Sequence, residues 1–268
     1  MTCYGDAVTS ASHQATIVDQ FTRQAVPFSE APGIKDEQAL ALLVAESGAG
    51  PDDTVLDVAC GPGLVVAAFA RFVRHATGVD ITPAMLARAR EIATARGLTN
   101  VQFDQSDVTS LPYADGSFTI VSSRFAFHHF LDPAAVLAEM RRVCAPGGRV
   151  VVVDLLASDD PAKAKAMNEM ERLRDPSHAR AMPLAELEPL IRDGDLTIRR
   201  RAFYRLPVEL EAVLERSFPA PGDADRVRAI FAASLADDAL GLGARRHGER
   251  EIRFEYPVVI LVAERPAR

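Results

Sequence analysis

Apolar positions between residues 54 and 153 follow two patterns, short β-branched runs and longer stretches with helical spacing. Short runs without strict polar alternation are typical of strands buried on both faces, and the helical stretches between them supply the cover. The pattern therefore predicts an α/β unit in which a parallel sheet lies between layers of helices. The predicted strands are residues 54–59, 75–79, 101–105, 118–122 and 149–154.

Two helices in this region have well-defined starts. Thr82-Pro83 and Asp132-Pro133 each place a side-chain cap before a proline at the first helical position. These helices are expected to run towards residues 96 and 144. The glycines of 146–148 then favour a tight turn into the next strand.

The flanking segments predict further elements around this unit. Residues 36–46 indicate an amphipathic helix, whereas residues 1–32 are mixed and favour a flexible flap over a site. The chain is thus expected to comprise an N-terminal flap and helix (1–50) and one catalytic domain (51–268). Cap or substrate insertions fall at about 155–195 and 205–250. Beyond residue 154 the predicted helices are 161–173, 183–192, 209–216 and 224–235, and the predicted strands are 196–204 and 252–263.

Composition narrows the classes of function. Among 268 residues, 37 acidic side chains exceed 30 basic ones, giving a formal charge of -7 that disfavours phosphate backbones and anionic membranes as partners. The apolar runs at 150–153 and 257–263 are far below the roughly 20 residues that span a bilayer. The start of the chain lacks a basic and apolar leader pattern, so a cytoplasmic location is expected. Cys3, Cys60 and Cys144 are too scattered to predict disulfides or a metal site.

The segment 55–63 carries the most chemical information. A buried strand leads through Gly61 and Gly63 into a helix, so a ligand can approach the bare backbone at the helix N-terminus. Taken alone, the same pattern also fits an ordinary strand-to-helix turn.

A carboxylate at the end of the next strand adds to this signal. Asp80 follows Gly78-Val79, where an acidic side chain can accept hydrogen bonds from both hydroxyls of a ribose. Dinucleotide binding favours a third glycine, and Val66 stands in its place. Asp57, just before the turn, suits a ligand ending in an ammonium group better than a pyrophosphate.

Five segments in order, 55–63, 78–85, 106–108, 118–130 and 137–154, resemble the motifs of class I S-adenosylmethionine-dependent methyltransferases, in particular the UbiE-like small-molecule branch. Residues 174–178 are similar to a motif of small-molecule members. The resemblance implies a Rossmann-like, doubly wound, mostly parallel seven-stranded sheet with helices on both faces, an antiparallel last strand and a helical cap. It also implies methyl transfer from S-adenosyl-L-methionine to an O, N or C nucleophile of a small organic molecule, leaving S-adenosyl-L-homocysteine.

The resemblance also implies the residues that hold this cofactor. Asp57 and the turn of Ala59, Cys60, Gly61, Pro62 and Gly63 would hold the methionine end. Asp80 would bind the ribose, with Ile81 and Met85 near the adenine. Asp107 would accept from the adenine amino group, with Ser106 and Val108 along the ring. The backbone at Ser123, Arg124 and Phe125 would close the methionine side. For Met85 and Val108, ordinary core packing is the alternative.

Methyl transfer from a sulfonium depends mainly on alignment and exclusion of water, and a base is needed only for a protonated nucleophile. His129, after the fourth strand, is the candidate general base. The alternative for His129 is a packing or capping role beside Asp132. For His128, that structural role is the favoured one. Phe28, His178 and Arg180 are candidate substrate contacts, with surface ion pairing as the alternative for the last two.

Two other functions remain open, an NAD(P)-dependent oxidoreductase and a non-catalytic S-adenosylmethionine-binding protein. The turn after Ser122 lacks the Asn/Asp-Pro-Pro-aromatic pattern of enzymes that methylate nucleobase amines. The scattered cysteines give little support to arsenic as an acceptor. We therefore expect a small-molecule acceptor, no nucleic-acid or membrane partner, no bound metal, and a monomer or homodimer.

Overall fold

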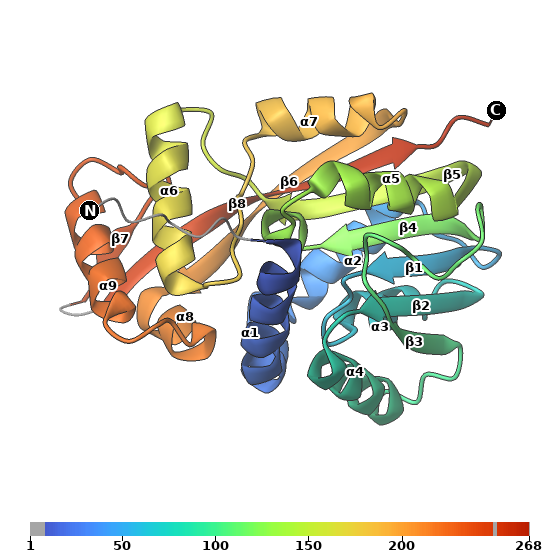
Figure 1. Ribbon diagram of the computed structural model, residues 1–268, viewed down its shortest axis with the longest axis horizontal. Helices are drawn as coiled ribbons and strands as arrows, with labels where there is room; N and C mark the ends of the chain where they lie inside the picture. The colour runs from blue at the N-terminus through green and yellow to red at the C-terminus, as the bar shows by residue number, and fades with distance from the viewer. Residues whose placement is uncertain (1–8, 249–250, 268) are drawn as a thin grey trace.

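The computed structural model describes residues 9–248 and 251–267. These residues form one eight-stranded sheet in the order β3-β2-β1-β4-β5-β8-β6, with the short β7 paired to β8 (Figure 1). The neighbours from β3 to β5 pair in parallel, and β8 runs antiparallel to both β5 and β6. The strands are β1 Thr54–Val58, β2 His75–Asp80, β3 Val101–Gln105, β4 Phe118–Arg124, β5 Cys144–Leu155, β6 Thr197–Glu209, β7 Arg245–His247 and β8 Glu251–Glu264.

Helices cover both faces of the sheet, as the sequence pattern predicts. On one face α2, α3 and α4 pack against side chains such as Val55 and Ile120, and on the other α5 and α7 pack against Leu56 and Val121. The helices are α1 Ser10–Glu30, α2 Glu37–Ser47, α3 Leu64–Phe69, α4 Pro83–Ala95, α5 Pro133–Val143, α6 Pro161–Arg174, α7 Leu184–Asp193, α8 Leu210–Ser217 and α9 Asp223–Ser234, with the 3-10 turn η1 at Phe127–His129. The predicted fold class is confirmed.

Two details of the sheet differ from the sequence prediction. The predicted turn at 146–148 lies inside an irregular start of β5, where Cys144 pairs with Phe118 before the register shifts. Gly148 permits this pairing, because a Cβ there would meet the Thr119 carbonyl oxygen at 2.8 Å. Strand β7 was not predicted, because its three residues are all exposed and only main-chain pairing with β8 defines it.

Residues 10–30 of the predicted flap form a 21-residue helix, α1, which the sequence analysis did not predict. Thr9 and Ser12 form a reciprocal capping box at its start. The helix buries polar side chains, including Gln20 and Gln24, and leaves Val26 58% exposed. The usual apolar stripe is therefore weak, which explains why the sequence did not predict this helix. Residues 1–8 of the predicted flap lie outside the described part of the chain.

The late strands extend beyond the rest of the sheet and support the helices of the predicted cap. β6 and β8 pair from Thr197–Glu264 to Glu209–Arg253, and α6, α8 and α9 gather around their far ends (Figure 1). Phe231 and Phe254 stack at 4.5 Å in a core that is continuous with the sheet. The cap is thereby joined to the sheet by shared strands and shared apolar packing.

Candidate functional site

A cavity of about 430 Å³ opens at the carboxyl ends of β1, β2 and β4, beside α1. This is the edge at which open α/β sheets bind ligands, next to the β1–β4 pair where the strand order reverses. Most of the cofactor residues implied by the resemblance line it. They are Asp57, Ala59, Cys60, Gly61, Pro62, Asp80, Ile81, Met85, Asp107, Val108, Arg124 and Phe125.

The turn after β1 is held in an unusual backbone conformation. Ala59, Gly61 and Gly63 all have positive φ, at 55°, 51° and 73°. This region costs a residue with a Cβ roughly 1–2 kcal/mol, so Ala59 is strained where the chain borders the cavity. Gly63 does not line the cavity, and a Cβ there would lie 2.8 Å from that of Ala89. Its role is to let α4 pack closely on the turn.

The close approach of α3 to β2 comes from a glycine on the strand. A Cβ at Gly78 would meet Cys60 Sγ at 2.7 Å and Val66 Cγ2 at 2.9 Å. Val66 can therefore fill the position where dinucleotide-binding turns favour glycine. Burial raises the pKa of Cys60 well above its ordinary value, so this thiol is a packing group and not a nucleophile.

Asp80 ties the end of β2 to the glycine turn. Its Oδ2 accepts the Gly61 N–H at 2.9 Å and its Oδ1 accepts the Thr82 N–H at 2.8 Å. Burial raises the pKa of Asp80, while these backbone donors oppose that shift. Each carboxylate oxygen keeps a further lone pair, so the group can still accept from a ligand hydroxyl.

Asp57 is the second buried carboxyl group of the site. It accepts a hydrogen bond from Ser122 Oγ at 2.7 Å and is 2% exposed. Burial raises its pKa to about 7, and the nearby charge of Asp80 acts in the same direction. Two desolvated carboxyl groups in one cavity favour a cationic ligand, whose charge would stabilise their ionised forms.

Asp107 contacts helix α1. Its Oδ2 accepts from Gln14 Nε2 at 2.6 Å, while its Oδ1 accepts from the backbone N–H and hydroxyl of Thr109 at 2.9 and 2.8 Å. The carboxylate that the resemblance assigns to the adenine amino group is therefore bonded to a side-chain amide of the protein itself.

His129 lines the cavity from η1. Its Nδ1 lies 2.9 Å from the Ser177 carbonyl oxygen, and its own carbonyl accepts from His13 Nε2 at 2.7 Å. A carbonyl oxygen only accepts, and the Ser177 hydroxyl, 3.2 Å from Nδ1, gives its own proton to Asp175 Oδ1. Nδ1 therefore carries the proton and Nε2 the lone pair. Burial, assisted by the charge of His128, lowers the pKa of His129 to about 4. The ring is therefore neutral at neutral pH.

The neighbouring His128 has a structural environment. Its Nδ1 lies 2.5 Å from Asp154 Oδ1, and its backbone N–H donates to Asp154 Oδ2 at 2.9 Å. Burial lowers the pKa of His128, but the adjacent Asp154 carboxylate outweighs this and raises the pKa above its ordinary value.

Two predicted substrate residues do not reach the cavity, although Phe28 lines it. His178 is 2% exposed and its Nε2 lies 2.8 Å from Asn168 Oδ1. Arg180 lies on the surface in a two-oxygen pair with Glu186. Of the predicted cofactor residues, Ser106 and Ser123 also lie outside the lining. The Ser106 N–H donates to the Asp80 carbonyl, and Ser123 is fully buried.

Sequence reasoning placed the N-terminal segment over a site and singled out Phe28, but it missed the other residues of α1 that line the cavity. Its lining residues are Ser10, His13, Gln14, Ile17, Phe21 and Phe28. The first five are spaced as one helical face, which was the available signal. Three polar members of this face, Ser10, His13 and Gln14, hid it, because an apolar stripe is the usual indicator of a buried side.

Two features missing from the described part of the chain concern metal sites and membrane spans. Within residues 9–248 and 251–267, no three His, Cys, Asp or Glu side chains are grouped as a metal site would need. Across the same residues, no helix has the length and apolar character to cross a membrane.

The chain is similar to known methyltransferases. A family model described as a methyltransferase domain matches residues 56–152. The uncharacterized methyltransferase YcgJ of Bacillus subtilis is 31% identical over 219 residues, covering 82% of this chain and 86% of that protein. A ubiquinone/menaquinone biosynthesis C-methyltransferase UbiE of Bdellovibrio bacteriovorus is 43% identical over 114 residues, covering 42% of this chain and 48% of its own length.

Solved structures of methyltransferases also share the fold of this chain. The crystal structure of YcgJ superposes with a TM-score of 0.80 at 28% identity, covering 85% of this chain and 98% of that one. A putative methyltransferase from Bacillus halodurans gives a TM-score of 0.80 at 26% identity, covering 85% and 99%.

Proposed function

The chain belongs to the class I S-adenosylmethionine-dependent methyltransferases and has UbiE-like relatives, and we propose that its cavity transfers the cofactor's methyl group to an oxygen, nitrogen or carbon atom of a small organic molecule. The observation that carries this proposal is the pair of buried carboxyl groups, Asp57 and Asp80, on either side of the glycine turn. Their raised pKa values favour a ligand that brings positive charge, as an ammonium and a sulfonium do.

The residues present fit S-adenosylmethionine. Asp57 and the turn from Ala59 would hold the methionine end, Asp80 the ribose, and Asp107 the adenine amino group, with Ile81 and Met85 along the adenine. When bound, this cofactor supplies an activated methyl group on a sulfonium. The protein then has to align the acceptor and exclude water, which the mostly apolar walls support.

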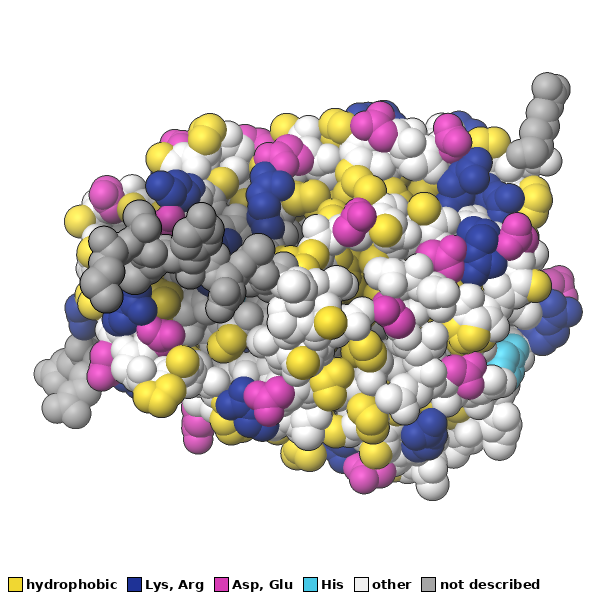
Figure 2. Space-filling model, in the orientation of Figure 1, with side chains coloured by type: hydrophobic (Ala, Val, Ile, Leu, Met, Phe, Trp, Pro, Cys, Tyr) yellow, Lys and Arg dark blue, Asp and Glu magenta, His cyan; other side chains and the backbone are white. Residues whose placement is uncertain are grey.

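The remaining walls indicate an acceptor with an apolar body. Aromatic and aliphatic side chains from three parts of the chain border the cavity, namely Ile17, Phe21, Phe28, Ile34, Phe130 and Leu131. Arg124 adds one guanidinium, which donates to the Ile34 carbonyl at 3.0 Å and lies over the Phe125 ring at 4.3 Å. On the face drawn in Figure 2, basic and acidic side chains are interspersed, unlike a surface for nucleic acid.

His129 is the proposed general base for acceptors whose nucleophile carries a proton. Its ring is neutral and its Nε2 holds a lone pair, which a base requires. A carbon or unprotonated nitrogen nucleophile would not need this step. His13 also lines the cavity, but its Nε2 is committed to the His129 carbonyl.

Titration calorimetry with S-adenosylmethionine and with NAD tests the cofactor, and a metabolite screen read by mass spectrometry tests transfer. We expect S-adenosylmethionine to bind, NAD not to bind, and one metabolite to gain a methyl group. Binding of NAD alone would favour an oxidoreductase. Cofactor binding with no methylated product across the screen would favour the non-catalytic alternative.

The contact between Gln14 and Asp107 gives a specific prediction. Since cofactor binding would have to exchange this hydrogen bond, Gln14→Ala is expected to tighten S-adenosylmethionine binding by about 0.5–1 kcal/mol, roughly two- to fivefold. Calorimetry measures the change, and Gln38→Ala, an exposed glutamine on α2, is the matched control. Weaker binding by the Gln14 variant would mean that this amide contacts the cofactor instead.

A further inference from the structure

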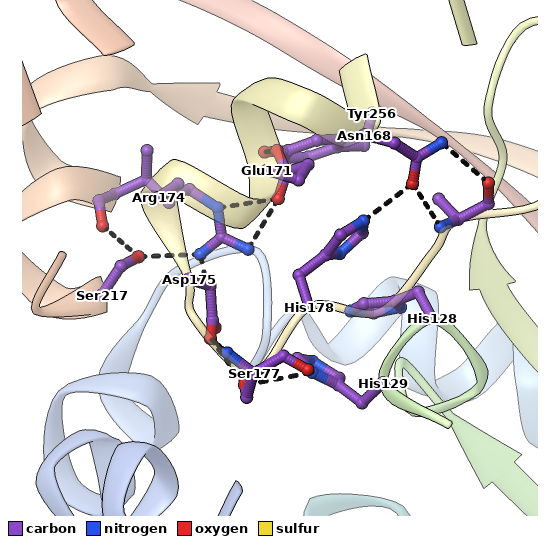
Figure 3. A network of polar contacts seen from close by, with 12 residues as sticks. His128, His129, Asn168, Glu171, Arg174, Asp175, Ser177, His178, Ser217 and Tyr256 are labelled. Carbon is purple, nitrogen blue, oxygen red and sulfur yellow. Dashed lines mark hydrogen bonds and ion pairs between the residues drawn. The ribbon is translucent and has the colours of Figure 1, made fainter. Parts of the chain in front are cut away.

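The segment from Arg174 to His178 does not line the cavity, yet it lies directly behind His129 (Figure 3). Asp175 follows the last residue of α6 and closes a tight turn. Its Oδ1 accepts from both the backbone N–H of Ser177 at 2.9 Å and the Ser177 hydroxyl at 2.5 Å. The His178 N–H donates to the Asp175 carbonyl at 2.9 Å. We name residues 175–178 the Asp175 turn.

Buried charges hold the Asp175 turn from the side of the cap. Arg174 Nη1 lies 3.8 Å from Asp175 Oδ2, and Arg174 Nη2 pairs with Glu171 Oε2 at 2.7 Å. Glu171 is fully buried and accepts from the Tyr256 hydroxyl at 2.5 Å. Gln24 of α1 adds a donor to Asp175 Oδ2 at 3.3 Å. The turn is thus fixed by α6, β8 and α1 together.

Three further hydrogen bonds attach the turn and the two residues that follow it to η1. The Ser177 carbonyl oxygen receives His129 Nδ1, and the N–H groups of Ala179 and Arg180 both donate to the His128 carbonyl at 2.9 Å. The rings of Phe21 and His129 pack edge to face, with their centroids 5.0 Å apart. Among the described residues none hydrogen-bonds His129 Nε2, which leaves that atom as the free polar group of a ring that lines the cavity.

We propose that the Asp175 turn is a positioning unit that fixes the tautomer of His129 with its Nε2 lone pair available to the acceptor. This inference rests on the proposed function, in which an acceptor O–H or N–H is methylated. As the acceptor atom bonds to the methyl carbon, the bond from that carbon to sulfur breaks and its electron pair stays on sulfur. The proton of the acceptor passes to Nε2.

The polar neighbours of His129 are consistent with this arrangement. His128 and His178 lie 4.3 and 6.4 Å away between ring centroids, and His13 contacts the backbone carbonyl. Asp175 acts through Ser177, and Asp154 is engaged by His128. None of these groups donates to Nε2. The Ser177 carbonyl, together with the Ser177 hydroxyl oxygen that Asp175 keeps as an acceptor, therefore selects the proton position on the ring.

Nitrogen-15 NMR of the full chain labelled in histidine tests the proposal without an acceptor or a cofactor. His129→Gln assigns the His129 signals. In the unaltered chain at pH 7, His129 is expected to show a protonated Nδ1 and an unprotonated Nε2. Asp175→Ala removes the acceptor of both Ser177 bonds, and the ratio of the two tautomers is expected to shift about tenfold towards protonated Nε2.

Two variants separate positioning from general damage to the fold. Asp175→Asn keeps an oxygen that can accept both Ser177 donors, so it is expected to retain the original tautomer. Asp160→Ala removes a comparable turn-capping carboxylate at the start of α6 and should leave the His129 signals unchanged. Circular dichroism confirms that each variant folds.

A protonated Nε2 in the unaltered chain would overturn the proposal, as would an unchanged tautomer in folded Asp175→Ala. If Asp175→Ala does not fold, Ser177→Ala, which removes the hydroxyl that Asp175 holds, takes its place, and an unchanged tautomer in that folded variant would also overturn the proposal. These results are independent of the cofactor, because the spectra are taken without it. Failure of S-adenosylmethionine to bind would instead contradict the proposed function alone.

Discussion

Replacing Asp80 with alanine is expected to weaken S-adenosylmethionine binding by about 1–3 kcal/mol, roughly five- to 150-fold, through loss of charge-assisted hydrogen bonds. Two effects contribute. The variant removes the proposed acceptor for the ribose hydroxyls, and it releases the Gly61 and Thr82 N–H groups that Asp80 now holds. The glycine turn would then lose its tie to β2 on the side that faces the cavity.

Calorimetry on the variant and the unaltered chain measures this change in affinity. Asp159→Ala is the matched control, because that carboxylate is exposed, lies outside the cavity and should leave binding unchanged. The thermal unfolding of the cofactor-free variant must be recorded alongside, since Asp80 also supports local backbone. Unchanged affinity in a folded Asp80 variant would show that the ribose site has been misplaced.

The cofactor side of the site was accessible to sequence reasoning because its signals are local. A buried strand followed by a turn with glycines at 61 and 63 predicts both the bend and its position. In a parallel sheet the carboxyl ends of neighbouring strands lie at one edge, so Asp57 and Asp80 had to converge once β1 and β2 were identified. The fold followed from the same strand-helix alternation.

The acceptor side was less accessible because its determinants depend on tertiary packing. Helix α1 buries Gln20 and Gln24 through hydrogen bonds to the Ser217 carbonyl, which periodicity of apolar residues does not reveal. His178 was predicted as a substrate contact, but its ring turns to Asn168 and does not line the cavity. The same segment instead contributes a backbone carbonyl, that of Ser177, and a sequence gives no sign of which carbonyl faces a histidine.

The affinity for S-adenosylmethionine is also expected to depend on pH through Asp57. Burial raises the pKa of this carboxyl group to about 7, so below that pH it is neutral in the cofactor-free protein. Binding an ammonium group favours the ionised form, so affinity should rise as the pH increases towards 7. Well below pH 7, linkage predicts that the affinity falls about tenfold for each unit by which the pH is lowered.

If the loss of affinity at acid pH disappears when Asp57 is replaced, that loss is due to Asp57. Asp57→Asn keeps an acceptor for the Ser122 hydroxyl but cannot ionise, so its affinity at pH 7 should be lower and nearly constant between pH 5.5 and 7. Calorimetry in this interval avoids the alkaline side, where the cofactor's own amino group, with an ordinary pKa of roughly 7.7–8.0, loses its proton. Methylthioadenosine, which lacks the ammonium group, should show a shallower dependence in the unaltered chain. An equally steep acid limb in Asp57→Asn would assign the titration to another group, and Asp80, whose pKa burial also raises, would be the first to test.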